Sequence, residues 1–299
     1  MHEEELRALH TASFRGRDAW RMPEFAGIDE GLPFVPDDFT QLYHTPAWEQ
    51  LSNPQRLRYN QLFGLRTNEL FMVFEKGVTQ QLIQALQQMQ DDVLLRDCLE
   101  GMLIEESRHH QMFLNFNRSL LPQAYAGSTR CFSRDSVLER GLPPALSRRP
   151  ALQPMLLWAV LVLEEFSTAF SRLLTLSSGL EPEYCRLHEL HLQDEQRHVE
   201  LDVLLMNRLM DQTGRMLRHI NGGLFRSFFR QVLSPRHSGP NVIRYLVRED
   251  DRLASREGSL LEQVRRLGQD PGLVNIMSNP DAMPLTHELL ARYPSFRWF

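Results

Sequence analysis

Residues 102–111 read MLIEESRHHQ, and residues 191–200 repeat much of this pattern as HLQDEQRHVE. Both stretches contain an acid, a Glu, one further residue, an Arg and a His in that order. A Glu and a His three positions apart share one face of an α-helix, so each pair can bind one metal ion. Chance alone supplies about one such pair in a chain with 11 histidines, so further features are needed. The pairs are Glu106 with His109, and Glu195 with His198.

Each motif follows another glutamate at the same distance. Glu75 lies 31 residues before the motif glutamate at 106, and Glu164 lies 31 residues before the one at 195. Two antiparallel helices that place glutamates side by side must turn near the midpoint of this spacing. The midpoints fall at the polar stretch 90–92 and at 177–179, which reads Ser-Ser-Gly, and both stretches predict turns. The sequence therefore indicates two related helical hairpins.

Four long segments carry apolar residues at spacings of three and four, which predicts helices. The connections between them are short, long and short, and the long one contains Pro122, Pro143 and Pro150. Two antiparallel hairpins joined by one long crossover are typical of the ferritin-like four-helix bundle. The predicted helices span about residues 65–90, 92–118, 152–176 and 182–212.

The rest of the chain predicts additions to this bundle. Residues 1–50 are rich in Pro and aromatic residues, which predicts an irregular arm with short helices, and prolines divide residues 213–299 into shorter helices. The tail at 292–299 is apolar enough to dock, and a subunit contact in a homodimer would cover it. We expect one domain over 1–299: an all-α, ferritin-like four-helix bundle with one long crossover, a core at about 65–212, and additional N- and C-terminal helices.

The interior of such a bundle would contain several carboxylates and imidazoles. Burying them together would be prohibitive without cations. Carboxylate-rich sites with one His per metal suit iron or manganese better than zinc or copper. His191 lies one turn before Glu195, where the first motif has Met102, so we expect an asymmetric site with an extra imidazole. The predicted metal ligands are Glu75, Glu106, His109, Glu164, His191, Glu195 and His198.

Neighbouring residues compete for some of these roles. Glu69 is the alternative to Glu75, and Glu165 is the alternative to Glu164, with the equal spacing as the argument for the residues chosen. A hydrogen-bonded core histidine is the alternative interpretation of His191.

Two more histidines and four charged residues flank the motifs. His188 is predicted to be structural, and His110 to face away from the metal. We expect Glu105 and Asp194 each to accept a hydrogen bond from a ligand histidine across the bundle, which would fix its tautomer. Arg108 is interpreted, with Arg197, as part of a flanking ion pair. Predicted core residues are Phe71, Phe74, Phe113, Leu161 and Leu201.

Composition excludes several classes of protein. Net charge is −5 without a basic stripe, which argues against nucleic-acid binding. No uncharged apolar run reaches the roughly 18 residues of a membrane helix, and the acidic N-terminus lacks a signal-peptide core. Three widely spaced cysteines fit a reducing cytoplasm. The sequence contains neither a Gly-x-Gly-x-x-Gly motif nor a Walker loop, so we expect no built-in nucleotide or flavin domain.

The complete pattern resembles the p-aminobenzoate N-oxygenase (AurF-type) family of di-iron enzymes. The resemblance covers about residues 65–212, and its most specific part is the His-x-x-x-Glu-x-x-His motif at 191–198. It implies a third histidine ligand at His191, two iron ions, and O2 as co-substrate. The implied reaction is N-oxygenation of a primary amine, either an arylamine or an amino acid tethered to a carrier protein.

The implied chemistry also needs a source of electrons. Because no nucleotide-binding fold is expected in the chain, a separate ferredoxin or reductase is implied. Two other functions remain open for the same site. One is C–H hydroxylation or desaturation by the same two irons, and the other is iron handling without enzymatic activity, as in ferritins.

Overall fold

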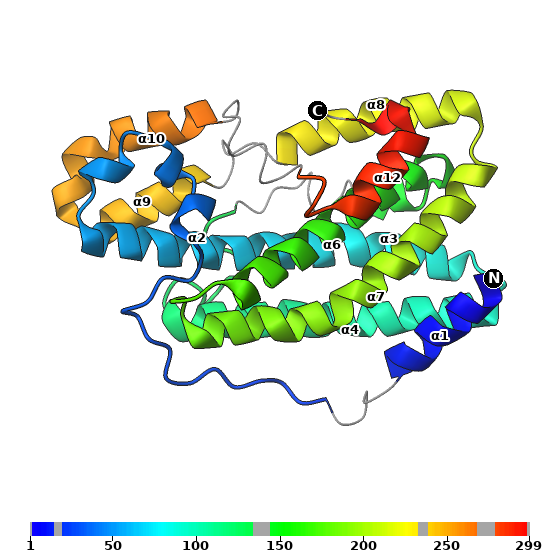
Figure 1. Cartoon of the computed structure of the whole chain (residues 1–299), viewed down its shortest axis with the longest axis horizontal. Helices are drawn as coiled ribbons and strands as arrows, with labels where there is room; N and C mark the ends of the chain where they lie inside the picture. Colours follow the sequence, from blue (N-terminus) through cyan, green and yellow to red (C-terminus); the bar gives the residue numbers. More distant parts are fainter. Residues whose placement is uncertain (1, 15–19, 134–143, 233–238, 268–278, 298–299) are drawn as a thin grey trace.

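The computed structural model describes residues 2–14, 20–133, 144–232, 239–267 and 279–297. Regular secondary structure in these residues is entirely helical, which confirms the all-α prediction. Long helices form a bundle, and shorter ones cover one side of it (Figure 1). The bundle helices are α2 (Asn53–Phe74), which continues through the π-helical turn η5 (Glu75–Thr79) into α3 (Gln80–Gln88), and α4 (Val93–Leu120), α6 (Gln153–Leu176) and α7 (Pro182–Gln212).

The two predicted hairpins have short turns with identifiable signals. Asp92 caps α4 by accepting a hydrogen bond from the Leu95 N–H at 3.3 Å. Between α6 and α7, Gly179 adopts a φ of 75°, which is a conformation that glycine adopts without steric cost. α7 then begins at Pro182, with the side chain of Glu181 as its cap.

The first bundle helix differs from the prediction in two respects. It begins at Asn53 rather than near 65, because Ser52 and Gln55 form a capping box there. The apolar periodicity misses this first part because Asn60 and Gln61 are buried polar residues that bind the backbone of the arm, for example Asn60 Nδ2 to Val35 O at 2.7 Å. The helix is also not a regular α-helix throughout, because η5 inserts a π-turn.

The N-terminal arm begins with a regular helix, α1 (His2–Phe14), where irregular chain with short helices was predicted. α1 packs against α4 and α7 (Figure 1). The described chain then runs irregularly from residue 20 to 52 through short 3-10 turns such as Asp37–Phe39 and Trp48–Gln50.

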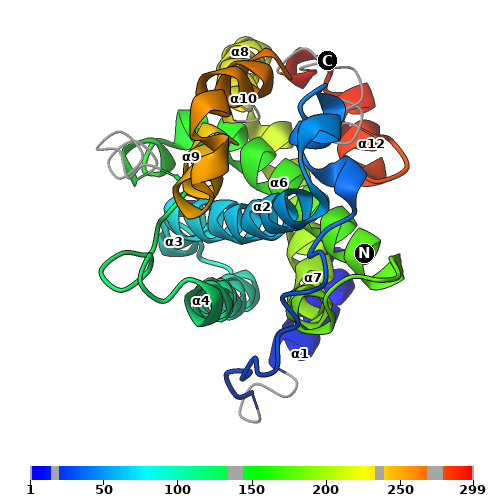
Figure 2. The same cartoon turned by 90° about the vertical axis from the view of Figure 1, so that its left-hand side faces the viewer.

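The C-terminal extension consists of α8 (Arg215–Val232), α9 (Gly239–Glu249), α10 (Glu257–Arg266) and α12 (Pro284–Arg292). These helices lie on the side of α2 and α6 that faces away from α4 (Figure 2). The tail that follows docks on its own chain: the ring of Phe296 is fully buried and stacks on Trp158 with the centroids 4.8 Å apart.

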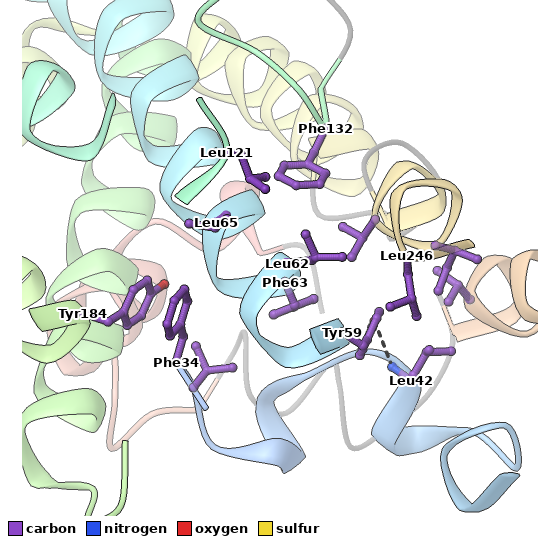
Figure 3. Packing of buried hydrophobic residues seen from close by; sticks show 14 of the residues in the cluster. Phe34, Leu42, Tyr59, Leu62, Phe63, Leu65, Leu121, Phe132, Tyr184 and Leu246 are labelled. Atoms are coloured by element: carbon purple, nitrogen blue, oxygen red, sulfur yellow. Dashed lines mark hydrogen bonds between the residues drawn. The ribbon is translucent and has the colours of Figure 1, made fainter. Parts of the chain in front are cut away.

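Two apolar cores lie along the bundle, one at each end of the predicted metal-binding residues. The first packs around α2, where Phe34 stacks on Tyr184 of α7 and Tyr59 lies near Leu246 of α9 (Figure 3). The second packs around α3 and α6 and includes Trp158. Along α4 the second core contributes Met102 and the first contributes Phe113, so the motif between them lies at the junction of the two cores. The five predicted core residues are placed accordingly: Phe71, Phe113, Leu161 and Leu201 are buried, and Phe74 is half-buried.

Only one described helix, spanning Pro150–Leu176, is long and apolar enough to cross a membrane. Within its most apolar window, 83% of the residues are buried inside the protein. Its apolar surface is therefore used by the bundle core.

Candidate metal centre

Buried histidine and carboxylate side chains from the bundle helices meet where the two cores join. Glu195 Oε1 lies at the middle of this cluster, 3.1–3.3 Å from one ring nitrogen of each of three histidines. All of these side chains are at most 5% exposed, so water does not compete for their polar atoms. Two groups have ligand atoms within 4.8 Å of one another: Glu106, His109, Glu195 and His198, and Glu75, His109 and His191.

Further contacts connect the rest of the predicted ligands. His198 Nδ1 lies 3.0 Å from Glu106 Oε1. His191 Nε2 lies 3.2 Å from Glu75 Oε1, which the π-turn η5 carries into the bundle. Glu164 of α6 is also buried, and the charges of Glu195 and Glu106 act on it. The structure thus brings all seven predicted ligand positions together.

Two carboxylates hold histidines from outside the cluster. Glu105 Oε2 lies 3.0 Å from His198 Nε2, and Asp194 Oδ2 lies 3.2 Å from His109 Nε2. Both contacts connect α4 with α7. An N–H at Nε2 leaves Nδ1 of each ring as the lone-pair nitrogen that faces the cluster, which is the tautomer a metal ligand needs.

One guanidinium joins these two outer contacts. Arg197 Nη2 donates to Glu105 Oε1 at 2.8 Å and to Asp194 Oδ1 at 2.6 Å. The sequence predicts an ion pair for Arg197 but not that one side chain serves both half-sites. Arg108, its counterpart in the first motif, lies over the ring of Trp20 at 4.8 Å from the centroid.

The charge of the cluster shifts the pKa of its members strongly. Burial raises the pKa of Glu164, and the nearby charge of Glu195 raises it further. Burial would also raise the pKa of Glu195, but the adjacent His191 and hydrogen bonds outweigh it and hold this pKa well below the usual range. For His109, burial acts against protonation, yet its contacts with Asp194 and Glu195 raise the pKa to about 10.

The donor set fits two divalent cations. Four ionised glutamates carry four negative charges, which two divalent ions balance, and three neutral imidazoles add nitrogen ligands. Several buried atoms of the cluster have no hydrogen-bond partner within the described residues, as expected of atoms that bind an ion. They are Glu75 Oε2, both oxygens of Glu106, His109 Nδ1, Glu195 Oε1 and His198 Nδ1.

The two alternative carboxylates have other partners. Glu69 accepts hydrogen bonds from the Tyr125 hydroxyl and from backbone N–H groups of residues 131–133, and so it anchors the crossover to α2. Glu165 accepts from the N–H groups of Leu285 and Thr286 at 2.8 and 2.7 Å, at the start of α12. Each is a buried acceptor for a peripheral segment.

The remaining histidines also lie outside the cluster. His188 Nε2 lies 3.1 Å from Asn68 Oδ1, and burial lowers the pKa of the ring well below its usual value, so it is a neutral core histidine. His110 Nδ1 lies 3.3 Å from the backbone oxygen of Met72.

Sequence reasoning missed two polar groups near the cluster. Ser167 donates its hydroxyl to Glu195 Oε2 at 2.9 Å. Asp202 is fully buried, neither of its carboxylate oxygens has a hydrogen-bond partner among the described residues, and burial raises its pKa well above the usual value. Asp202 lies four residues after His198 on the same helical stripe, and this spacing was the signal that could have revealed it.

Comparison with known proteins agrees with this geometry. The family described as "P-aminobenzoate N-oxygenase AurF" matches residues 13–247. The chain belongs to the AurF family. Its members are oxidoreductases with a di-iron centre, and the buried histidine–glutamate cluster fits the two iron ions, with O2 as the usual co-substrate.

The fold is shared with a solved structure described as an R2-like ligand-binding oxidase with an aerobically reconstituted metal cofactor. The sequences are 16% identical, the match covers 98% of this chain and 94% of that chain, and the TM-score is 0.51. This likeness confirms the predicted ferritin-like helical bundle. No curated protein matches the sequence of this AurF-family chain.

Proposed function

We propose that this AurF-family protein uses O2 to N-oxygenate a primary amine, and that an arylamine is the substrate class. The observation that carries the proposal is His191. Its Nε2 lies 3.1 Å from Glu195 Oε1 and 3.2 Å from Glu75 Oε1, so a third imidazole joins the four-carboxylate cluster. The name of the family supports an amine nitrogen as the atom that is oxidised.

The proposed metal ligands are the seven residues predicted from the sequence. Two iron ions bound there would supply the electrons for reductive activation of O2. Glu105 and Asp194 would hold the ring tautomers, and Arg197 would hold both carboxylates in place. Phe113 packs 4.9 Å from the His191 ring, and Phe71 stacks on the same ring at 5.8 Å. These rings would exclude water from the oxidising site.

The test is anaerobic loading with Fe(II), followed by exposure to O2 with and without p-aminobenzoate. We expect a transient absorption that decays faster with the amine and a product 14 or 16 mass units heavier. A product oxidised at carbon would favour C–H hydroxylation or desaturation instead, and a ferric mineral core would favour iron handling. Failure with the free amine but oxidation of a carrier-tethered amino acid would change the substrate class.

His191→Ala is the variant that addresses the third imidazole, and His188→Gln is its control. Both histidines lie on α7 and are fully buried, but only His191 contacts the cluster carboxylates. We expect His191→Ala to change the lifetime of the transient absorption while the fold is retained, and His188→Gln to leave that lifetime unchanged. Identical lifetimes in wild type and His191→Ala would contradict the proposed ligand set.

Three further proposals accompany this function. An external ferredoxin or reductase would supply electrons, the protein would act in the cytoplasm, and it would form a homodimer. The cytoplasmic proposal is supported by three free thiols. For the dimer, sedimentation would show one species of twice the chain mass.

A further inference from the structure

Two surface hollows of nearly equal size lie along α7. One, of about 650 Å³, is lined by α4, α7 and the chain after residue 20, and its lining includes His109, Asp194 and Arg197. The other, of about 660 Å³, lies near the far end of α7, includes Arg208 and contains no residue of the cluster. We call the first one the Arg197 hollow.

The Arg197 hollow reaches the outer side of the metal cluster. His109 is 3% exposed, and its Nε2 faces Asp194, whereas its Nδ1 faces the cluster. Asp194 and Arg197 are 22% and 21% exposed. A molecule in the hollow therefore contacts the groups behind the ligand histidines, and the atoms that would bind metal face the other way. This placement suits electron entry better than entry of a substrate that must meet the metal itself.

Hydrogen bonds connect the hollow to both half-sites. From Arg197, one path runs through Asp194 to His109 with contacts of 2.6 and 3.2 Å. The second path runs through Glu105 to His198 with contacts of 2.8 and 3.0 Å. One surface position is thus two contacts from a ligand of either motif.

The mouth of the hollow is rich in arginine. Its lining includes Arg21, Arg108 and Arg186 in addition to Arg197. Three acids also line the hollow, Glu24, Glu105 and Asp194, so arginines outnumber acids by one among its described lining residues. The side chain of Arg186 is 46% exposed, whereas its partner Glu183 is 22% exposed. This local excess of arginine occurs on a chain with a net charge of −5.

We propose that the Arg197 hollow is the docking site for an acidic electron-transfer protein of the [2Fe–2S] ferredoxin type. Complementary charge would steer a transient complex, which needs only a small interface. Electrons would pass along the contacts from Arg197 to His109 and His198. Two reduced ferredoxins each lose one electron, and the two electrons convert two ferric ions to ferrous ions. This inference rests on the proposed function, because it is that function which requires an electron donor.

The test measures reduction of the oxidised, iron-loaded protein by a reduced plant-type [2Fe–2S] ferredoxin in an anaerobic stopped-flow instrument. Arg186→Glu reverses the charge at the mouth, and Arg208→Glu is the matched control. Both arginines lie on α7, with side chains 46% and 47% exposed and one carboxylate partner each. Arg186→Lys keeps the charge. Circular dichroism checks that each variant is folded.

We expect Arg186→Glu to lower the second-order rate constant about tenfold at low ionic strength, and this difference to shrink in about 0.5 M salt. Arg208→Glu and Arg186→Lys should stay within about twofold of wild type. Reduction by dithionite with methyl viologen should be equal in all variants. The proposal would be overturned if the rate constant fell equally in Arg186→Glu and Arg208→Glu. It would also be overturned if reduction of the wild type by ferredoxin did not depend on salt.

A second measurement separates a donor site from a substrate entrance. Enzyme reduced chemically and given O2 and p-aminobenzoate should show the same amine dependence in wild type and Arg186→Glu. A higher amine requirement in Arg186→Glu would identify the hollow as the path of an anionic substrate and contradict the docking proposal. Absence of amine oxidation in every variant would contradict the proposed function but not the docking proposal, because reduction by ferredoxin is measured separately.

Discussion

Glu69→Gln separates the role of a structural carboxylate from that of a metal ligand. Glu69 accepts hydrogen bonds from the Tyr125 hydroxyl, three backbone N–H groups and the Ser133 hydroxyl, all from the crossover. A glutamine offers one acceptor oxygen and turns an NH2 group toward donors. Whichever way the amide is oriented, at least two of these donors lose their acceptor.

The size of the effect follows from the charge on the acceptor. Hydrogen bonds to a charged group contribute about 1.5–3 kcal/mol each, so losing two lowers the free energy of unfolding by about 3–6 kcal/mol. The unfolding entropy of about 2.1 cal/mol/K per residue, taken over 299 residues, converts this loss into a melting temperature roughly 5–10 °C lower. Calorimetry or thermal circular dichroism of the apo-protein measures it.

Glu75→Gln is the matched control, because Glu75 is the other candidate on the same helix and is also buried. It contacts His191 in the cluster rather than the crossover. We expect Glu69→Gln to bind two irons per folded chain despite its lower stability. Glu75→Gln should lose iron without losing apo-protein stability, since it removes one of several clustered negative charges. The opposite pairing, with normal stability and lost iron in Glu69→Gln, would refute the reasoning.

Three further changes have distinct expected outcomes. Glu165→Ala leaves two N–H groups at the start of α12 unpaired and should lower the free energy of unfolding by about 1–3 kcal/mol in chemical denaturation, with iron content unchanged. Arg197→Met should weaken iron retention about 10–100-fold in a chelator competition, because it releases both carboxylates behind the histidines; unchanged retention would contradict that role. Asp202→Asn should stabilise the apo-protein at neutral pH. Burial raises the Asp202 pKa above its unfolded value. The free energy of unfolding therefore falls as pH rises from the unfolded to the folded pKa, by up to about 1.4 kcal/mol per pH unit. The variant should lack this slope.

The sequence predicted the bundle because its signals are local and redundant. The spacing of Glu75 and Glu164 from the two motifs placed the turns, and capping residues such as Asp92 agree with that placement. The same pattern identified the positions that meet in the cluster, since residues three and four apart on a helix share a face in any packing.

Other features depend on tertiary partners that are distant in the sequence. In the local sequence, Glu69 and Glu165 look like the predicted metal ligands. Only their contacts to the crossover and to α12 distinguish them from ligands. The π-turn at Glu75 and the buried Asn60 lack an apolar signature. Arg197 could be predicted to form an ion pair, but its link to both motifs requires α4 and α7 to be placed side by side.

Iron content and Mössbauer spectra of the protein loaded anaerobically with ⁵⁷Fe(II) test the central claim most directly. The cluster of Glu75, Glu106, His109, Glu164, His191, Glu195 and His198 predicts two high-spin ferrous ions per chain in two different environments, because only one half-site has an extra imidazole. Glu195→Ala should abolish both, since Glu195 Oε1 contacts all three histidines. One iron per chain, or two irons retained by Glu195→Ala, would contradict the assignment.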